Sequence, residues 1–302
     1  MVTVNERVRA PRAHTINGID AGGMMTARIT EGYDEQLKSS PDGLQVPLKD
    51  KYTEFVRGTI TTQDLTTPIA VMTGIVGTLV FYEKRMGGDE ITGYIKHTIN
   101  NPIVHRINIS SRKGQYGTIT YDFECLAADE TEGILDMWEQ LDGQAAPTYI
   151  EAARGGWRIA SAVWSTAISI YHITAFDFTL AANLIKESND LDVGYTCCEA
   201  VLEGLTGTGS LSFQDATIDG TPAILKLATL ITSAPDKLVL TIVSSQGAAA
   251  KVLTLLGVDW ISSDSNSDVN ATFTEYTGNF EIVNNLTTQL TLAGTNKILD
   301  IA

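Results

Sequence analysis

The sequence predicts a mainly β protein made of two tandem β-sandwich domains, each with one short flanking helix. First, the chain has 302 residues, which is enough for two domains of ordinary size. Second, short segments alternate apolar and polar residues between Gly, Ser and Asn clusters, a pattern typical of strands and turns. Third, several motifs recur half a chain length apart. We place the domains at residues 1–146 and 147–302.

The internal repeat rests on matches that occur in the same order in both halves. Gly58–Asp64 (GTITTQD) matches Gly209–Asp215 (GSLSFQD) at a separation of 151 positions. Thr67-Pro68 matches Thr221-Pro222, where we expect Thr as a helix N-cap and Pro at the first helical position. The alternative is two unrelated β-rich halves with common strand and turn residues. A third match aligns Tyr121–Glu124 with Thr272–Glu275.

Strands and one further helix are expected from residue periodicity. The strand segments are Leu79–Tyr82, Ile103–Ile109, Thr118–Phe123, Leu238–Ile242, Lys251–Trp260 and Asn279–Val283. The helix would begin at an Asp129 cap and end at Gly143. Its apolar face would consist of Ile134, Leu135, Trp138 and Leu141. Because this segment lies at the domain boundary, we expect it to dock one domain onto the other.

A long polar segment, Glu31–Asp50, lies between two expected strands and contains Pro41, Gly43 and Pro47. A loop of this length inside a compact domain is usually functional or poorly ordered. The second half has a shorter, less charged counterpart at Glu187–Tyr195. The charged residues of the long loop are Asp34, Glu35, Lys38, Asp42, Lys49 and Asp50.

The composition argues against several classes of protein. The net charge of −15 is shared by both halves, so no basic stripe for binding a phosphate backbone is expected. Cys125, Cys197 and Cys198 form no Cys-x-x-Cys motif or disulfide framework, which favours folding in a reducing compartment. The N-terminal residues lack the apolar core of a secretory signal. The uncharged runs Leu65–Tyr82 and Ile159–Phe176 contain many β-branched residues, so we expect core structure and no membrane insertion.

No motif of enzymatic chemistry is present. The sequence lacks the phosphate-binding, nucleophile-elbow and zinc-protease patterns, and its four histidines are isolated, so we predict neither enzymatic activity nor a cofactor. One segment resembles an EF-hand calcium loop, although Val269 replaces the required Gly and the flanks favour strands. A solvated loop is the alternative there. The candidate calcium ligands are Asp264, Asn266, Asp268 and Glu275.

The two Gly-x-x-x-x-Gln-Asp strands and the two Thr-Pro helix starts belong to an acidic, duplicated sandwich with a long loop. In these features the chain resembles the tail tube (major tail) protein of tailed bacteriophages, of the duplicated-domain type. The resemblance implies that six domains form a ring, with their strands joined into a barrel around a channel. Three duplicated chains would therefore form each pseudo-hexameric ring. Rings would stack into a tube, with the loop Glu31–Asp50 as the inter-ring contact.

The resemblance also implies the partners and location. The chain would assemble with itself in the host cytoplasm, become part of the virion tail, and meet tape-measure, tail terminator and baseplate proteins. Double-stranded DNA would pass through the lumen without specific binding, since an acidic wall repels phosphate. Three alternatives stay open: a baseplate, terminator or injection-system tube component; a calcium- or carbohydrate-binding β-sandwich module; and a hydrolase whose catalytic residues are dispersed in the sequence.

Overall fold

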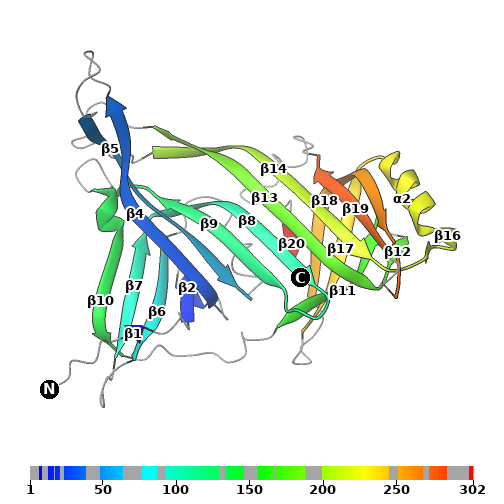
Figure 1. Cartoon of the computed structure of the whole chain (residues 1–302), viewed down its shortest axis with the longest axis horizontal. Coiled ribbons are helices and arrows are strands. Elements are labelled where there is room, and N and C mark those ends of the chain that lie inside the picture. The colour runs from blue at the N-terminus through cyan, green and yellow to red at the C-terminus, as the bar shows by residue number, and fades with distance from the viewer. Residues whose placement is uncertain are drawn as a thin grey trace.

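The chain folds into large antiparallel β-sheets with one α-helix among the residues described by the computed structural model (Figure 1). The structure thus confirms the predicted mainly β class. The described residues are 7–8, 13–16, 18–20, 24–38, 48–63, 77–86, 93–128, 133–145, 156–165, 167–187, 199–244, 251–267, 272–283 and 299–301.

The first sheet has six strands, all from the first half of the chain. Its order is β10-β7-β6-β2-β3, and β1 pairs with β6. A short 3-10 helix, η1 (Ile134–Met137), directly precedes β10. The strands of this sheet are β1 (Arg7–Val8), β2 (Ala13–Ile16), β3 (Ile19–Asp20), β6 (Thr78–Met86), β7 (Tyr94–Asn100) and β10 (Trp138–Gln144).

The second sheet has twelve strands and passes through both halves of the chain. Its order is β12-β11-β17-β18-β19-β14-β13-β8-β9-β5-β4, and β20 pairs with β18. The first half contributes β4 (Met24–Lys38), β5 (Leu48–Thr62), β8 (Pro102–Arg112) and β9 (Thr118–Cys125). The second half contributes β11 (Trp157–Trp164), β12 (Ile168–Ile170), β13 (Ile173–Glu187), β14 (Glu199–Phe213), β17 (Asp236–Ser244), β18 (Lys251–Asn266), β19 (Glu275–Ile282) and β20 (Leu299–Ile301).

The helix expected after Thr221-Pro222 is present as α2 (Ala223–Ile231). It buries Ala223, Leu227 and Leu230. The predicted cap was wrong, because Pro222 is the N-cap and β16 (Thr221–Pro222) pairs with β15 (Thr217–Ile218). The backbone NH of Ala223 instead donates to the carbonyl of Ala216 at 3.0 Å. The matching helix start at Thr67 lies outside the described residues.

The amphipathic helix predicted from Asp129 to Gly143 was wrong. Its middle forms only η1, and the segment from Trp138 onwards is the edge strand β10, paired with β7 from Trp138↔Ile99. The Trp138 indole NH donates to His97 Nδ1 at 3.3 Å, which ties the strand to its neighbour. Leu141, expected on the buried face, is exposed. Cross-strand pairing therefore outweighs the helical periodicity of this segment.

The long loop predicted at Glu31–Asp50 is for the most part a β-hairpin. Strand β4 continues to Lys38 and β5 begins at Leu48, and Lys38 pairs with Leu48. Only residues 39–47 between them lie outside the described part of the chain. The second half has the same construction, because β13 and β14 are also 15 residues each, as β4 and β5 are. The expected difference in size between the two loops is therefore not reflected in their strands.

The order of strand pairing in the first half recurs in the second. The succession β4-β5-β9-β8 in the first half corresponds to β13-β14-β19-β18 in the second. Likewise, the hairpin β2-β3 pairs with β6, as the hairpin β11-β12 pairs with β17. Strand β18 corresponds to both β7 and β8. Up to Val258 it pairs with β17, as β7 pairs with β6, and from there on it pairs with β19, as β8 pairs with β9. Gly257 at this change has φ +73°, and Asn101, between β7 and β8, has φ +48°.

The register agrees at a glycine in the middle of each hairpin. Gly58 lies opposite Phe123, and Gly209 lies opposite Phe280. A Cβ atom on Gly58 would lie 2.7 Å from the Phe123 ring and 2.6 Å from the Arg28 carbonyl oxygen. Only glycine therefore fits beneath the aromatic ring.

The same close approach occurs at the second glycine. A Cβ atom on Gly209 would lie 2.5 Å from the Phe280 ring and 2.7 Å from the Asp177 carbonyl oxygen. By this pairing Phe123 corresponds to Phe280. The alignment of Tyr121–Glu124 with Thr272–Glu275, which the sequence suggested, was therefore wrong.

Replacing either glycine by alanine should destabilise the fold. We expect Gly58→Ala and Gly209→Ala each to lower the free energy of unfolding by about 1–3 kcal/mol, because the added methyl group forces the aromatic ring and a backbone carbonyl apart. Urea denaturation followed by circular dichroism measures the change. Ser210→Ala, next in the strand and on its opposite face, is the matched control. Unchanged stability of the glycine variants would contradict the close contact.

Candidate functional site

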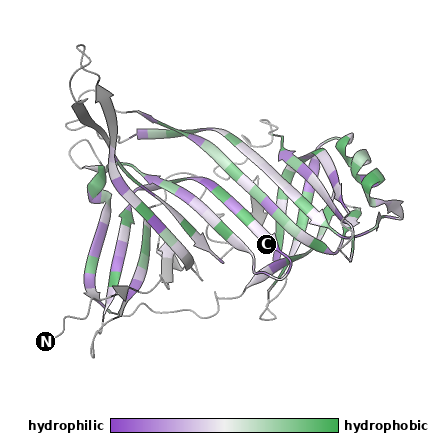
Figure 2. Cartoon of the chain, viewed as in Figure 1, coloured by the Kyte–Doolittle hydropathy of each residue, from purple (hydrophilic) through white to green (hydrophobic). Residues whose placement is uncertain are grey.

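The twelve-stranded sheet has one apolar and one polar face where the two halves meet. On β9, Ile119, Tyr121 and Phe123 are buried while the alternate residues are only partly buried. Figure 2 shows the same alternation of hydrophobic and hydrophilic residues along the neighbouring strands. A sheet of this kind packs one face on the core and leaves the other exposed to solvent.

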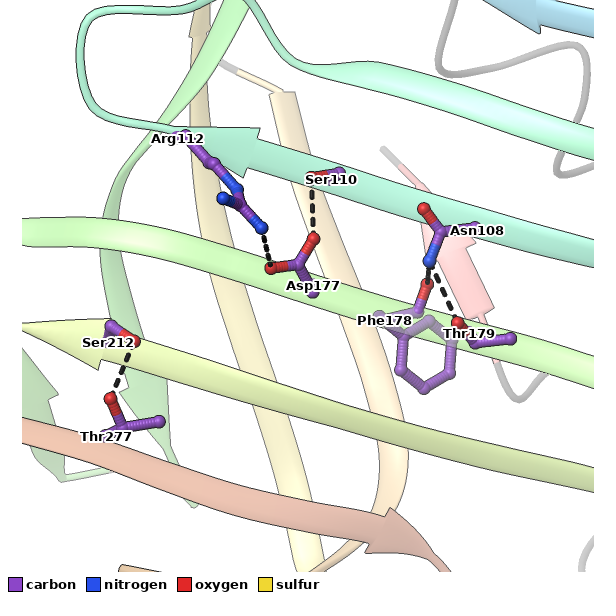
Figure 3. A network of polar contacts seen from close by, with 8 residues as sticks. All are labelled: Asn108, Ser110, Arg112, Asp177, Phe178, Thr179, Ser212 and Thr277. Atoms are coloured by element: carbon purple, nitrogen blue, oxygen red, sulfur yellow. Dashed lines mark hydrogen bonds and ion pairs between the residues drawn. The ribbon is translucent and has the colours of Figure 1, made fainter. Parts of the chain in front are cut away.

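Polar side chains join the two halves at the seam between β8 and β13. The backbone pairs here run from Arg106↔Ala181 to Arg112↔Ala175. The Ser110 hydroxyl donates to Asp177 at 2.6 Å, and Arg112 Nη2 lies 3.6 Å from the Asp177 carboxylate (Figure 3).

A second contact lies further along the same seam. The Asn108 amide donates to the Thr179 hydroxyl at 2.9 Å and approaches the Phe178 carbonyl oxygen at 3.5 Å. Both contacts connect β8 to β13, as Figure 3 shows. The seam is therefore held by main-chain pairing and by short side-chain hydrogen bonds on the polar face.

Hydroxyl and carboxylate pairs continue across the polar face on both sides of the seam. Thr59 donates to Asp122 at 2.7 Å between β5 and β9. Between β14 and β19, the hydroxyls of Ser212 and Thr277 are 2.8 Å apart (Figure 3). Asn279 bridges β19 to β18 by donating to the Ser262 hydroxyl at 2.9 Å. Many polar groups of this face are thus satisfied by their cross-strand neighbours.

The charges on the polar face are divided between the halves. In the first half this face carries two carboxylates, Asp122 and Glu124, and four arginines. The second half places four carboxylates on this face, and its Lys186 contacts the Glu124 carboxylate of the first half. The register places on this face Arg28, Arg57, Arg106 and Arg112 in the first half, and Asp177, Asp259, Asp264 and Glu281 in the second. The face is therefore not uniformly acidic, although the whole chain is.

Within the two four-strand successions, two strands have an edge without a partner strand among the described residues. One is β4, which pairs only with β5. The other is the C-terminal part of β18, Asp259–Asn266, which pairs with β19 on one side only. These edges are the two ends of the four-strand successions, as Figure 1 shows for β4. An unpaired edge exposes a row of backbone donors and acceptors that can bind another strand.

The residues predicted for the inter-ring loop lie on a two-stranded arm or outside the described residues. Strand β5 pairs with β9 only from Arg57 to Thr62, so Leu48–Val56 and its partner β4 continue beyond the sheet (Figure 1). The structure places Asp34, Glu35 and Lys38 on β4, and Lys49 and Asp50 on β5, while Asp42 lies outside the described residues.

The candidate calcium ligands do not lie in a helix–loop–helix. Asp264 and Asn266 belong to β18, Glu275 begins β19 directly opposite Asn266, and Asp268 lies outside the described residues. The Asn279 amide also approaches the Asp264 carboxylate at 3.3 Å. In the described part of the chain, no three His, Cys, Asp or Glu residues gather into a group that could hold a metal ion.

Two histidines make local contacts within the fold. His97 is buried and stacks on Phe81 at 4.3 Å, and its Nε2 lies 3.2 Å from the Glu83 carboxylate. Since the Trp138 NH already donates to Nδ1, Nε2 carries the proton of the neutral ring and donates to Glu83. His172 contacts the Asp215 carboxylate, which also accepts the backbone NH of Tyr171. The sequence gave no signal of these contacts, because each histidine is isolated from the other histidines along the chain.

An open cavity of about 1080 Å³ lies beside the seam. Trp157 forms part of its wall and donates its indole NH to the Gln63 carbonyl at 2.8 Å. The described lining contains Arg112, Arg158 and Tyr116 but no histidine, cysteine or carboxylate. These residues can attract an anion, and the described wall does not place an acid–base pair there.

A scan against protein-family models and a search of the curated proteins each found no match to this chain. Among the described helices, none has the length and apolarity needed to cross a membrane. The uncharged run Ile159–Phe176 forms parts of β11 and β13 with β12 between them, apart from one residue that is not described.

The Cys125 thiol should be inert in the folded protein. Burial, and to a lesser degree the nearby Glu124 carboxylate, raise the pKa of Cys125 to about 12. The reactive thiolate is then scarce at pH 8. In a C197S/C198S variant we expect no labelling by iodoacetamide until denaturant is added, after which one thiol reacts. Rapid labelling of the native variant, measured by mass spectrometry, would contradict this burial.

Proposed function

We propose that the chain is a structural subunit of a phage tail tube, in which three chains form a ring around a channel. The observation that carries this proposal is that two four-strand successions join at β8 and β13 into one sheet and leave one open edge at each end. These open edges belong to β4 and to Asp259–Asn266 of β18, while their counterparts β13 and β8 pair with each other inside the chain. The open edges of β4 and β18 can pair with neighbouring chains in the same way that β8 and β13 pair inside the chain.

The recurrence of pairing order supports the proposal that the chain contains two copies of one unit, at residues 1–146 and 147–302. Both halves place a glycine beneath a phenylalanine of the neighbouring strand, Gly58 with Phe123 and Gly209 with Phe280. Both also build their hairpin from strands of 15 residues. A unit that joins the next unit through unlike edges forms a closed ring if the rotation between units closes.

The number of chains in a ring follows from two copies of the unit per chain and from the six-unit ring that the tail-tube resemblance implies. Each chain would supply two of six units, so three chains would close the ring and pair the open edges of β4 and β18 in every chain. The polar face would then form the channel wall. Its arginines are accompanied by carboxylates such as Asp122 and Asp177, so it lacks the uncompensated cation cluster that tight phosphate binding requires. DNA could pass without being held.

The two hairpin arms would connect rings along the tube. In Figure 1 the arms β4–β5 and β13–β14 extend at the same side of the chain. A projecting ribbon with open backbone groups is suited to contact the ring above it. In this role the chain is a structural component and not an enzyme, and it would also meet tape-measure and terminator or baseplate proteins in the assembled virion tail.

Electron microscopy and mass photometry of purified protein test the function directly. We expect rings of three chains and, at higher concentration, long tubes with a central channel. Rings that never stack would favour a terminator, baseplate or related ring component. A chain that stays monomeric at high concentration would contradict the proposal, because the two open edges would then lack their partner.

Shortening the first arm should separate ring formation from stacking. We expect deletion of Pro41–Pro47 to prevent tubes while leaving rings, because β4 and β5 are unchanged and only the connection between them is shortened. Circular dichroism checks folding, and negative-stain microscopy counts rings and tubes. The matched control replaces the same seven residues by a flexible linker of equal length. Normal tube formation by the deletion variant would refute the role of this arm.

A further inference from the structure

We propose that a second copy of this chain pairs its β4 with β18 of the first copy in one defined register. The arginine and the carboxylate at this contact lie on the opposite strands from those of the internal Arg112–Asp177 pair. Arg28 would lie opposite Asn266, and Thr30 opposite Asp264. This inference rests on the proposed ring and adds the residues that form the contact between chains. The template for it is the seam inside the chain.

The internal seam fixes the geometry. There, Ser110 of β8 lies opposite Asp177 of β13, and Asn108 lies opposite Thr179. Each of these pairs is joined by a side-chain hydrogen bond, from Ser110 to Asp177 and from Asn108 to Thr179. We apply the register of this seam to the contact between chains, with β4 in the place of β13 and β18 in the place of β8.

The correspondence of β4 and β13 follows from their hairpins. Gly58 pairs with Ile29, and Gly209 pairs with Phe178. Ile29 therefore corresponds to Phe178. Counting one residue in each direction, Arg28 corresponds to Asp177 and Thr30 to Thr179.

The correspondence of β18 and β8 follows from their pairing with the phenylalanine strands. Phe123 pairs with Val104, and Phe280 pairs with Trp260. In both strands a register shift follows directly, between Val104 and Arg106 and between Trp260 and Ser262. Because the irregularity occurs at the same place, the count can be continued beyond it. Asn108 then corresponds to Asp264, and Ser110 to Asn266.

The charged side chains lie on opposite strands in the two seams: Arg28 takes the place of Asp177, and Asp264 takes the place of Asn108. Inside the chain, arginine is on the β8 side and carboxylate on the β13 side, as the Arg112–Asp177 pair shows. Between chains, the carboxylate Asp264 is on the β18 side and Arg28 is on the β4 side. Both are exposed on strand edges without a partner strand in the described structure. Arg28 would lie diagonal to Asp264, a distance that a long side chain can bridge.

The reversal also excludes wrong pairings. If β8 paired with β4, Arg112 would lie near Arg28, and if β18 paired with β13, Asp264 would lie near Asp177. Like charges at such positions are unfavourable. The internal seam would therefore not exchange with the seam between chains. Each chain keeps its own halves together and offers only unlike edges to its neighbours.

Cysteine cross-linking tests the register. In a C197S/C198S background, Glu31→Cys and Ser263→Cys would be direct neighbours across the seam and leave the charged pair unchanged. Oxidation should give covalent dimers and trimers on non-reducing gels. The matched control combines Ala27→Cys with Ser263→Cys, displaced by about 13 Å along the strand, which is too far for a disulfide. Stronger cross-linking of the control than of the predicted pair would overturn the register.

A charge exchange tests the electrostatic part. We expect Arg28→Glu to weaken ring formation about tenfold or more in mass photometry, and the double variant R28E/D264R to restore much of it. Arg158→Glu, an exposed arginine on β11 away from both edges, is the control with the same change of charge. Rings that form normally in R28E would overturn the charged contact while leaving the ring proposal intact. Absence of rings in the unmodified protein would instead refute the proposed function.

Discussion

The structure depends on one constraint: the backbone groups at the edge of a strand need a partner. Inside the chain this constraint is met by pairing β8 of the first half with β13 of the second, which makes one sheet of two similar sets of strands. The same arrangement leaves β4 and the end of β18 as edges. The polar face, the divided charges and the projecting hairpins all take their positions from this sheet. A proposal for function must therefore account for these edges first.

The alternation of residues was sufficient to predict most strands of the core, and the Thr-Pro motif predicted α2 in the second half. The glycine match between Gly58 and Gly209 was also a sound signal, because both glycines are required beneath a phenylalanine. The third match failed, since Thr, Phe and Glu are common in strands and the spacing between the repeat elements changes along the chain. Only the observed register identified Phe280 as the counterpart of Phe123.

Other features were hidden from sequence reasoning for identifiable reasons. The spacing of Ile134, Leu135, Trp138 and Leu141 fits a helix, but pairing with β7 and the Trp138–His97 contact favour a strand. The arm β4–β5 looked like a loop because its two strands continue beyond the sheet, where the alternation that marks a half-buried strand is not required. The divided charge of the polar face could not be predicted either, since register alone brings Arg112 to Asp177.

A duplicated chain has a physical advantage over separate single units in building a ring. In the ring we propose, one of every two seams would form within the chain, where the effective concentration of the two halves is high. Only the alternate seams would then require association between chains. The two kinds of seam are then free to differ in sequence. The internal seam combines Arg112 with Asp177, whereas the open edges carry Arg28 and Asp264 in the opposite arrangement. A chain with unlike edges of this kind would add to the proposed ring in one orientation, which would favour closure over disordered association.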